Sequence, residues 1–228
     1  MKAVLSRLSL LIVAMTMLFA SCEKESGSET NQPEGGNNNP ELAGNTINGH
    51  EYVDLGLPSG LKWVTCNIGA TNPEDFGNYY AWGETSTKNE YLENNCTTVG
   101  VDLSEISGDA QYDAARAKWG STWRLPTAEE FEELTNMCTW TWVTQNNVNG
   151  MKVTGQNGKS IFIPATGYRS GSSLNYVGEY GYFWSSTTYT NNNNIDKYNA
   201  YYLGFLSGGH SVSWGNRSYG YTIRPVSN

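Results

Sequence analysis

The chain has few histidines, and they lie far apart. Its 228 residues include two, His50 and His210, and no His-Glu-x-x-His sequence occurs. His210 follows two glycines in a predicted turn, where a surface histidine is the usual occupant. The histidine-dependent triads and zinc-protease motifs therefore have no support in the sequence. We expect a protein that is not an enzyme.

Basic residues are also scarce. There are 14 Lys and Arg against 22 Asp and Glu, a net charge of −8. Cleavage after residue 21 would remove two basic residues and no acid, leaving 12 basic against 22 acidic residues and a balance of −10. An acidic chain without a basic cluster is not typical of nucleic-acid-binding proteins. We predict no nucleic-acid partner.

Long apolar runs are absent except at the N-terminus. Lys2 and Arg7 precede an apolar run over residues 8–20, which predicts a signal peptide at residues 1–21. The run is short for a bilayer span, and Leu18-Phe19-Ala20-Ser21-Cys22 resembles the lipobox of bacterial lipoproteins. This resemblance implies lipidation of Cys22, a membrane contact through the lipid, and an outer-membrane lipoprotein exposed at the cell surface. An ordinary secretory signal and an uncleaved anchor are the alternatives.

The segment after Cys22 has almost no apolar residues. Residues 22–46 are rich in Ser, Asn, Gly, Pro and Glu. Such a segment cannot bury enough apolar surface to order itself, so we predict a flexible tether. Glu23 and Glu25 resemble surface-export signals of Bacteroidota lipoproteins. Residues 47–228 are long enough for one domain with a good core.

A helix is predicted in the middle of this domain. Thr127 and Glu130 have the spacing of a capping box, and Pro126 excludes a helix that continues from upstream. Phe131 and Leu134 recur at helical spacing, so the pattern predicts a helix from Ala128 to Met137. Residues 109–119, with Asp109 as cap and Gly120 as stop, predict a second helix. Two helices joined so closely should pack on one core.

Strand patterns surround these helices. Period-two alternation and β-rich composition mark most of them, and residues 155–158 predict a hairpin turn. Residues 85–108 and 167–181 read as loops. The predicted strands are 51–55, 61–66, 78–83, 139–142, 151–154, 160–164, 182–189, 199–206, 211–214 and 221–226. Strands, then two helices, then many strands predict an α+β fold.

Several motifs together carry a family resemblance. They are Tyr52-Val53-Asp54-Leu55-Gly56-Leu57-Pro58-Ser59-Gly60-Leu61-Lys62-Trp63, Trp82-Gly83-Glu84, Ala114-Ala115-Arg116, Trp123-Arg124-Leu125-Pro126-Thr127, Ile161-Phe162-Ile163-Pro164, Phe183-Trp184-Ser185-Ser186 and Ile223-Arg224-Pro225-Val226. Over residues 47–226 the chain resembles the Fibrobacter succinogenes major paralogous domain of Bacteroidota lipoproteins. The segment from Arg124 through Glu130 and Phe131 is also similar to the sulfatase-modifying, formylglycine-generating group. Both resemblances imply a C-type-lectin-like fold, with two helices on a twisted, mostly antiparallel sheet, paired terminal strands and long loops.

The formylglycine-generating resemblance implies an enzyme with reactive cysteines in its C-terminal part. No cysteine follows Cys138 here, so that nucleophile has no matching position. The lectin-like fold invites calcium-dependent sugar binding instead. Gln32-Pro33-Glu34 lies in the tether and Trp214-Gly215-Asn216 lacks the acid of the lectin motif. Asp102, Glu105, Asp109 and Asp113 are close in sequence, but a solvated loop explains them equally well, and we predict neither a metal nor a cofactor.

Aromatic residues are the remaining candidates for a site. Trp63, Trp82, Trp123 and Trp184 lie in strand-like or motif segments and are expected in the core. Tyr168, Tyr176, Tyr180 and Trp214 lie in or near predicted loops, where they can either pack or bind a sugar ring. Arg124 and Arg224 alternate with apolar residues, so we expect them to be structural and paired with carbonyl or carboxylate groups.

The domain has three cysteines, and export leads to an oxidising compartment. We predict one disulfide among Cys66, Cys96 and Cys138, with Cys66–Cys138 the favoured pairing; three buried thiols are the alternative.

The sequence thus favours a surface-tethered, non-enzymatic module that binds a glycan or protein ligand or has a structural role. The alternatives are an enzyme of the formylglycine-generating type and a structural subunit of fimbriae or the envelope. An exposed, long, unpaired strand would favour the latter.

Overall fold

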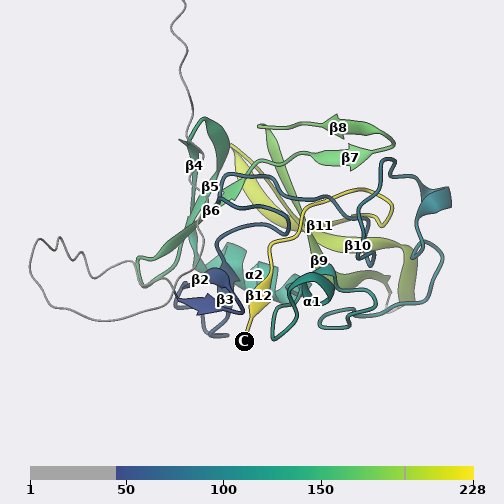
Figure 1. Ribbon diagram of the computed structural model, residues 1–228, viewed down its shortest axis with the longest axis horizontal. Coiled ribbons are helices and arrows are strands. Elements are labelled where there is room, and N and C mark those ends of the chain that lie inside the picture. The colour runs from purple at the N-terminus through teal and green to yellow at the C-terminus, as the bar shows by residue number, and fades with distance from the viewer. Residues whose placement is uncertain (1–44, 193) are drawn as a thin grey trace, which may run out of the picture. The chain divides into compact units, whose positions relative to one another are not determined.

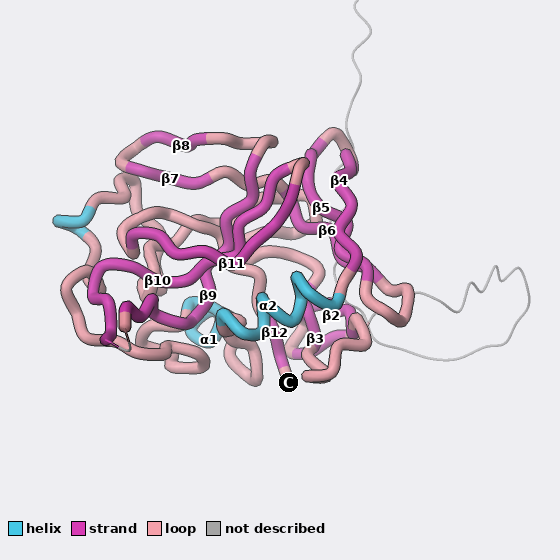
Figure 2. Tube along the Cα trace, turned by 180° about the vertical axis from the view of Figure 1, so that it is seen from behind, coloured by secondary structure: helices cyan, strands magenta, loops and turns pink. Residues whose placement is uncertain are grey.

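The structure of the protein is a computed structural model that describes residues 45–192 and 194–228. Strand accounts for 43% and helix for 10% of it, and a single helix there exceeds six residues. The predicted α+β class is therefore wrong. The described chain is mostly β and forms four small sheets, not one sheet covered by two helices. Figure 2 shows strands over much of the described chain and helix in only a few short stretches.

The first helix is much shorter than predicted. α1 (Ala114–Trp119) is capped by Asp113, whose side chain accepts hydrogen bonds from the N–H groups of Ala115 and Arg116. The predicted cap, Asp109, instead accepts from Gln111 in a preceding turn. α1 also buries its alanines in a different core cluster from the second helix, so the two helices do not share one core. A single 3-10 turn, η1 (Glu93–Asn95), lies upstream.

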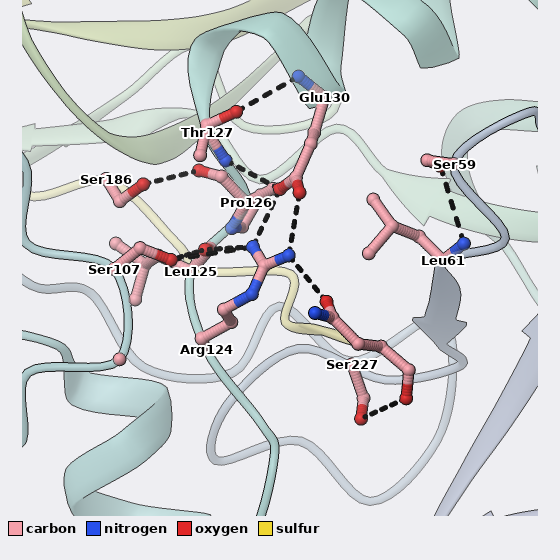
Figure 3. Close-up of polar contacts among 12 residues, drawn as sticks. Ser59, Leu61, Ser107, Arg124, Leu125, Pro126, Thr127, Glu130, Ser186 and Ser227 are labelled. Carbon is pink, nitrogen blue, oxygen red and sulfur yellow. Dashed lines mark hydrogen bonds and ion pairs between the residues drawn. The ribbon is translucent and has the colours of Figure 1, made fainter.

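The second helix, α2 (Ala128–Met137), is confirmed with its capping box. The Thr127 side chain accepts from the Glu130 N–H, and the Glu130 carboxylate accepts from the Thr127 N–H. Arg124 donates two hydrogen bonds, of 2.7 and 2.8 Å, to the same carboxylate, and it also donates to the Asn228 side chain (Figure 3). The structural role predicted for Arg124 is confirmed, because it joins the start of α2 to the end of the chain.

The two ends of the domain pair in one sheet. Its order is β1-β2-β3-β12, with Val226 opposite Trp63 and β12 antiparallel to β3. The pairing of terminal strands that the family resemblance implies is present at this pair. The C-terminal strand starts later than predicted, because Tyr221 and Thr222 form only isolated bridges, to Tyr80 and Phe183. The strands are β1 (Thr46–Ile47), β2 (His50–Asp54), β3 (Lys62–Val64) and β12 (Val226–Ser227).

A three-stranded antiparallel sheet lies between two cores. It consists of β9 (Tyr180–Asn191), β10 (Asn194–Leu206) and β11 (Gly209–Asn216), in the order β11-β10-β9 (Figure 1). Side chains alternate between its faces because successive residues of a strand point to opposite sides. Phe183 and Leu203 join Phe131 of α2 in one cluster, whereas Trp184 and Ala200 join the cluster that contains α1.

Two further hairpin-based sheets complete the domain. β4 (Thr139–Gln145), β5 (Val148–Thr154) and β6 (Ser160–Pro164) form one, and the predicted 155–158 turn joins its last two strands. β7 (Tyr168–Ser170) and β8 (Ser173–Asn175) form the other. Residues 167–181 are therefore not simply a loop, as predicted. Residues 78–83 are not a strand, since Tyr80 alone forms a bridge there.

Two buried arginines tie loops to these sheets. Arg224, 1% exposed, donates to the Asn67 side chain and to carbonyls of Val64, Thr65 and Phe162, as its predicted structural role requires. Arg217 is equally buried and was not singled out from the sequence. Its guanidinium lies 4.3 Å from the centroid of the Trp82 ring and donates to several carbonyls of residues 98–103 and 196–199. All four tryptophans predicted to be core are fully buried.

Candidate functional site

Seven tyrosines form one continuous cluster on the β9–β10 side of the second core. Neighbouring rings in the cluster have centroid separations between 5.0 and 6.1 Å. The cluster, called the tyrosine cluster below, consists of Tyr168, Tyr176, Tyr180, Tyr182, Tyr202, Tyr219 and Tyr221. Three of the four aromatic residues predicted as ligand-binding candidates, Tyr168, Tyr176 and Tyr180, belong to it.

The strands explain how residues so far apart in sequence meet. Tyr180 and Tyr182 are two residues apart on β9, so they lie on the same face, and their rings stack at 6.1 Å. Tyr202 comes from β10, and its ring lies 5.5 Å from that of Tyr182. Tyr168 comes from β7 and lies 5.1 Å from Tyr182. Sequence analysis missed Tyr182 and Tyr202 because both stand in strands, where a packing role was expected.

The cluster runs from the core to the surface. At its base Tyr221, 3% exposed, stacks on the buried Trp184 at 4.1 Å. At its outer end Tyr176 is 53% exposed and has a left-handed backbone with φ of 56°. Such a conformation is costly for a tyrosine, and residues of this kind concentrate at functional sites. The cluster therefore connects a buried base to an exposed outer ring.

A groove opens at the outer side of the cluster. Its volume is about 380 Å³, which is in the range of roughly 300–1,000 Å³ common for ligand sites. Its lining combines residues of β9 and β10 with glycines and other residues of the β10–β11 hairpin. The groove, called the tyrosine groove below, is lined by Tyr180, Tyr182, Tyr202, Gly204, Phe205, Leu206, Gly208, Gly209, His210 and Ser211.

Two glycines let the Tyr202 ring lie over the sheet. A Cβ atom on Gly204 would be 2.9 Å from Cε2 of Tyr202, and one on Gly215 would be 3.3 Å from Cε1. Opposite edges of the ring therefore cover the two glycines, and a side chain at either position would push against the ring. The Tyr202 ring therefore lies along the surface of the sheet in the groove and does not project outward from it.

The groove carries no formal charge in its lining. It contains no Lys, Arg, Asp or Glu. Burial, and then the neighbouring tyrosines, raise the pKa of Tyr182 to about 12, so this phenol stays protonated at neutral pH. Burial lowers the pKa of His210, which favours the neutral imidazole. The tyrosines of the site can therefore offer ring faces and hydroxyl groups, and the lining carries no fixed charge.

His210 is not the surface turn residue that the sequence predicted. It stands in β11 and is partly buried, with its ring stacked on Trp140 of β4 at 4.5 Å. Its Nδ1 atom is buried without a hydrogen-bond partner. The turn consists of residues 207–208. The two glycines before His210 suggested that the turn extends to this residue, whereas His210 already belongs to the strand.

Trp214 lies apart from the tyrosine groove. It pairs with Tyr201 across β10 and β11, and therefore shares a face of the sheet with Tyr201 and not with Tyr202. Its ring, 51% exposed, stacks on Tyr189 at 4.8 Å. The fourth predicted aromatic candidate thus belongs to a separate surface group, and the structure does not bring it to the other three.

A larger hollow beside the loop at residues 83–88 has a different character. Its volume is about 540 Å³, and the Glu84–Lys88 ion pair of 2.7 Å stands in its wall. Tyr112 is the one aromatic residue among its lining residues. Apolar and aromatic surface with a few placed polar groups characterises ligand sites better than volume does, so we take the tyrosine groove as the candidate site.

The acids considered for calcium do not converge. Asp113 is fully buried and accepts four backbone N–H groups, Glu105 accepts from Thr187, and Asp102 pairs with Lys197. Across residues 45–192 and 194–228, no group of three or more His, Cys, Asp or Glu side chains is placed to hold a metal ion.

The predicted Cys66–Cys138 disulfide is wrong. Cys66, Cys96 and Cys138 are all free in the described part of the chain. The Cys66 sulfur contacts the Thr71 carbonyl, and the Cys96 sulfur contacts the Arg217 carbonyl, so each sits in its own polar surroundings. Cys138 is at the C-terminal end of α2. Cys22, the predicted lipidation site, lies outside the described residues.

The fold and the site together define a class: a mostly β domain with an uncharged, tyrosine-lined surface groove. Residues 129–226, which include the tyrosine cluster, match the sequence model of a domain of unknown function, DUF8237. Searches of the curated proteins and of the solved structures returned no match. Among the described residues, none of the helices has the length and apolar character needed to cross a membrane.

Proposed function

We propose that the chain is a surface-tethered, non-catalytic binding module that holds a carbohydrate in the tyrosine groove. The observation that carries the proposal is the Tyr202 ring laid along the sheet beside Tyr180 and Tyr182. A pyranose ring has an apolar face of C–H groups and a rim of hydroxyls. Tyrosine matches both, because its ring face is apolar and its hydroxyl can donate or accept a hydrogen bond.

The same groove is less suited to a proline-rich peptide, which docks between aromatic side chains that leave slots for its ridges. The ring laid along the sheet favours a flat ligand face. The predicted signal peptide, the lipobox-like segment ending at Cys22 and the composition of residues 22–46 support a tethered location outside the cytoplasm.

A glycan array, with proline-rich peptides spotted on the same slides, tests the proposal. The full chain in detergent should bind carbohydrate spots, and Tyr180→Ala should bind them about five- to thirtyfold more weakly, since stacking on one aromatic ring contributes on the order of 1–2 kcal/mol. Trp214→Ala is the matched control, because it also removes an exposed aromatic ring but lies outside the groove. Equal losses in both variants, or binding only to the peptides, would contradict the proposal.

A second role, as a structural subunit of fimbriae or the envelope, has one observation in its favour. β11 is an edge strand of eight residues, paired with β10 on one side among the described strands. Such edges can add a strand from another molecule. Light scattering of the full chain tests this role: concentration-dependent growth of filaments supports it, and a constant particle mass speaks against it.

A further inference from the structure

We infer that a second pocket, lined by Arg169 of β7 and by residues of the segment 77–91, binds a small oxyanion group through the Arg169 guanidinium. The pocket, called the arginine pocket below, includes Tyr79, Lys88 and Tyr91 in its lining and has a volume of about 250 Å³. This volume is below the roughly 300–1,000 Å³ of common ligand sites, so it fits a single carboxylate, sulfate or phosphate group. None of its lining residues belongs to the tyrosine groove, and the inference does not depend on carbohydrate binding there.

Arg169 differs from the other arginines of the described chain. Within residues 45–192 and 194–228 its guanidinium donates no hydrogen bond and forms no ion pair, and its contact is with the Tyr79 ring. An arginine keeps its charge in proteins and carries five N–H donors, so those of Arg169 are available to a ligand. The other four arginines donate guanidinium hydrogen bonds to distant or neighbouring parts of the domain: Arg116, Arg124, Arg217 and Arg224.

The position of Arg169 is fixed although its donors are free. Its backbone exchanges two hydrogen bonds of 2.9 Å with Gly220. A Cβ atom on Gly220 would be 2.9 Å from Cβ of Arg169 and 2.7 Å from Cε1 of Tyr91, so the glycine leaves space for both side chains. The guanidinium carbon lies 5.2 Å from the centroid of the Tyr79 ring, which is within cation–π range. A cation held in this way loses less freedom when an anion binds.

The aromatic walls of the arginine pocket are held as well. Tyr91 exchanges two backbone hydrogen bonds with Gly171, next to β7. The Tyr91 hydroxyl donates to the Tyr79 carbonyl, and the Tyr79 hydroxyl donates to the Thr166 carbonyl at 2.6 Å. Both phenol protons are therefore engaged inside the domain. The rings shape the pocket, and the guanidinium supplies its free charged donors.

The charges of the arginine pocket favour an anion. Its lining contains no Asp or Glu. Lys88 is in the lining, but its ammonium group pairs with Glu84 at 2.7 Å, so the net positive charge comes from Arg169. An unpaired cation in a chain of net charge −8 is unusual enough to require a partner. A guanidinium fork matches two oxygens of a carboxylate, sulfate or phosphate, and such charge-assisted pairs are stronger than neutral ones.

The Nε–H NMR signals of the full chain, labelled with ¹⁵N-arginine and kept in detergent, test the inference. The Arg169 signal is the one missing from the spectrum of Arg169→Met. Acetate, sulfate and phosphate are titrated separately, and sodium chloride is titrated as the control. At least one oxyanion should shift the Arg169 signal saturably, with a half-maximal shift at a concentration at least about tenfold below that for chloride, the gain from one charge-assisted hydrogen bond. The signals of Arg217 and Arg224, which are buried, should stay in place.

The anion with the lowest half-maximal concentration distinguishes a carboxylate ligand from a sulfate or phosphate ligand. An Arg169 signal that none of the three oxyanions shifts would overturn the inference, and so would a shift that chloride reproduces at equal concentration. Tyr180→Ala should titrate like the wild type, because Tyr180 lines the other groove; a lost response would contradict the assignment to the arginine pocket. Arg169→Lys also removes the signal and provides the assignment if Arg169→Met does not fold.

Discussion

Replacing Arg224 by methionine is expected to destabilise the whole domain. The guanidinium donates to Asn67 Oδ1 at 2.8 Å, to the Val64 and Phe162 carbonyls at 3.1 Å each, and to the Thr65 carbonyl. Leaving these four acceptors without their donor costs about 1 kcal/mol each, and removing a buried charge offsets part of that cost. We expect a net loss of about 3 kcal/mol, a large part of a typical stability of roughly 5–15 kcal/mol.

Thermal unfolding followed by circular dichroism measures this loss. For a domain of this size 1 kcal/mol shifts the midpoint by about 2–4 °C, so Arg224→Met should unfold about 6–12 °C earlier than the wild type. Arg169→Met is the control: that guanidinium is partly exposed, lies 5.2 Å from the Tyr79 ring centroid, and should matter by less than about 1 kcal/mol. Equal midpoints for the two variants would refute the reasoning.

Three further predictions concern the groove, the thiols and alkaline pH. Gly204→Ala should tilt the Tyr202 ring and weaken glycan binding on the array while leaving the unfolding midpoint within a few degrees, and unchanged binding would contradict the assigned ring position. Alkylation without a reducing agent should label all three domain cysteines in guanidinium. In the native protein at pH 8 Cys138 should react slowly, because burial and then the Glu133 charge raise its pKa to about 11; a disulfide-linked peptide would contradict this. Because burial raises the pKa of Tyr182 from 10.0 to about 12, its contribution to stability is complete below pH 10 and is lost as the pH rises toward 12. Tyr182→Phe should therefore lose less stability over that interval, as measured by urea unfolding.

Local signals in the sequence predicted local structure well. The Thr127–Glu130 capping box and the apolar spacing of Phe131 and Leu134 located α2 to the residue, since a helix start depends on side chains a few positions apart. The 155–158 turn between β5 and β6 was equally visible. Arg124 and Arg224 were identified as structural because a charge within an apolar segment must find partners.

The fold class failed for a physical reason that the sequence does not display. Asp109 and Asp113 are both acceptable caps, and the choice of Asp113 depends on N–H groups of Gly108 and Leu125 that reach it only in the folded domain. That choice shortens α1 to six residues and removes the predicted second helix layer. The sequence identified only part of the candidate site. The loop tyrosines were predicted, whereas Tyr182 and Tyr202 were not, because their place in the cluster depends on the β9–β10 register, which is a long-range property.

A crystal structure of the full chain with an oligosaccharide that binds on the glycan array tests the central claim most directly. We predict a pyranose ring lying against Tyr202 beside Tyr180 and Tyr182. A sugar bound instead in the hollow beside residues 83–88, or on the Trp214–Tyr189 pair, with the tyrosine groove empty, would contradict the account.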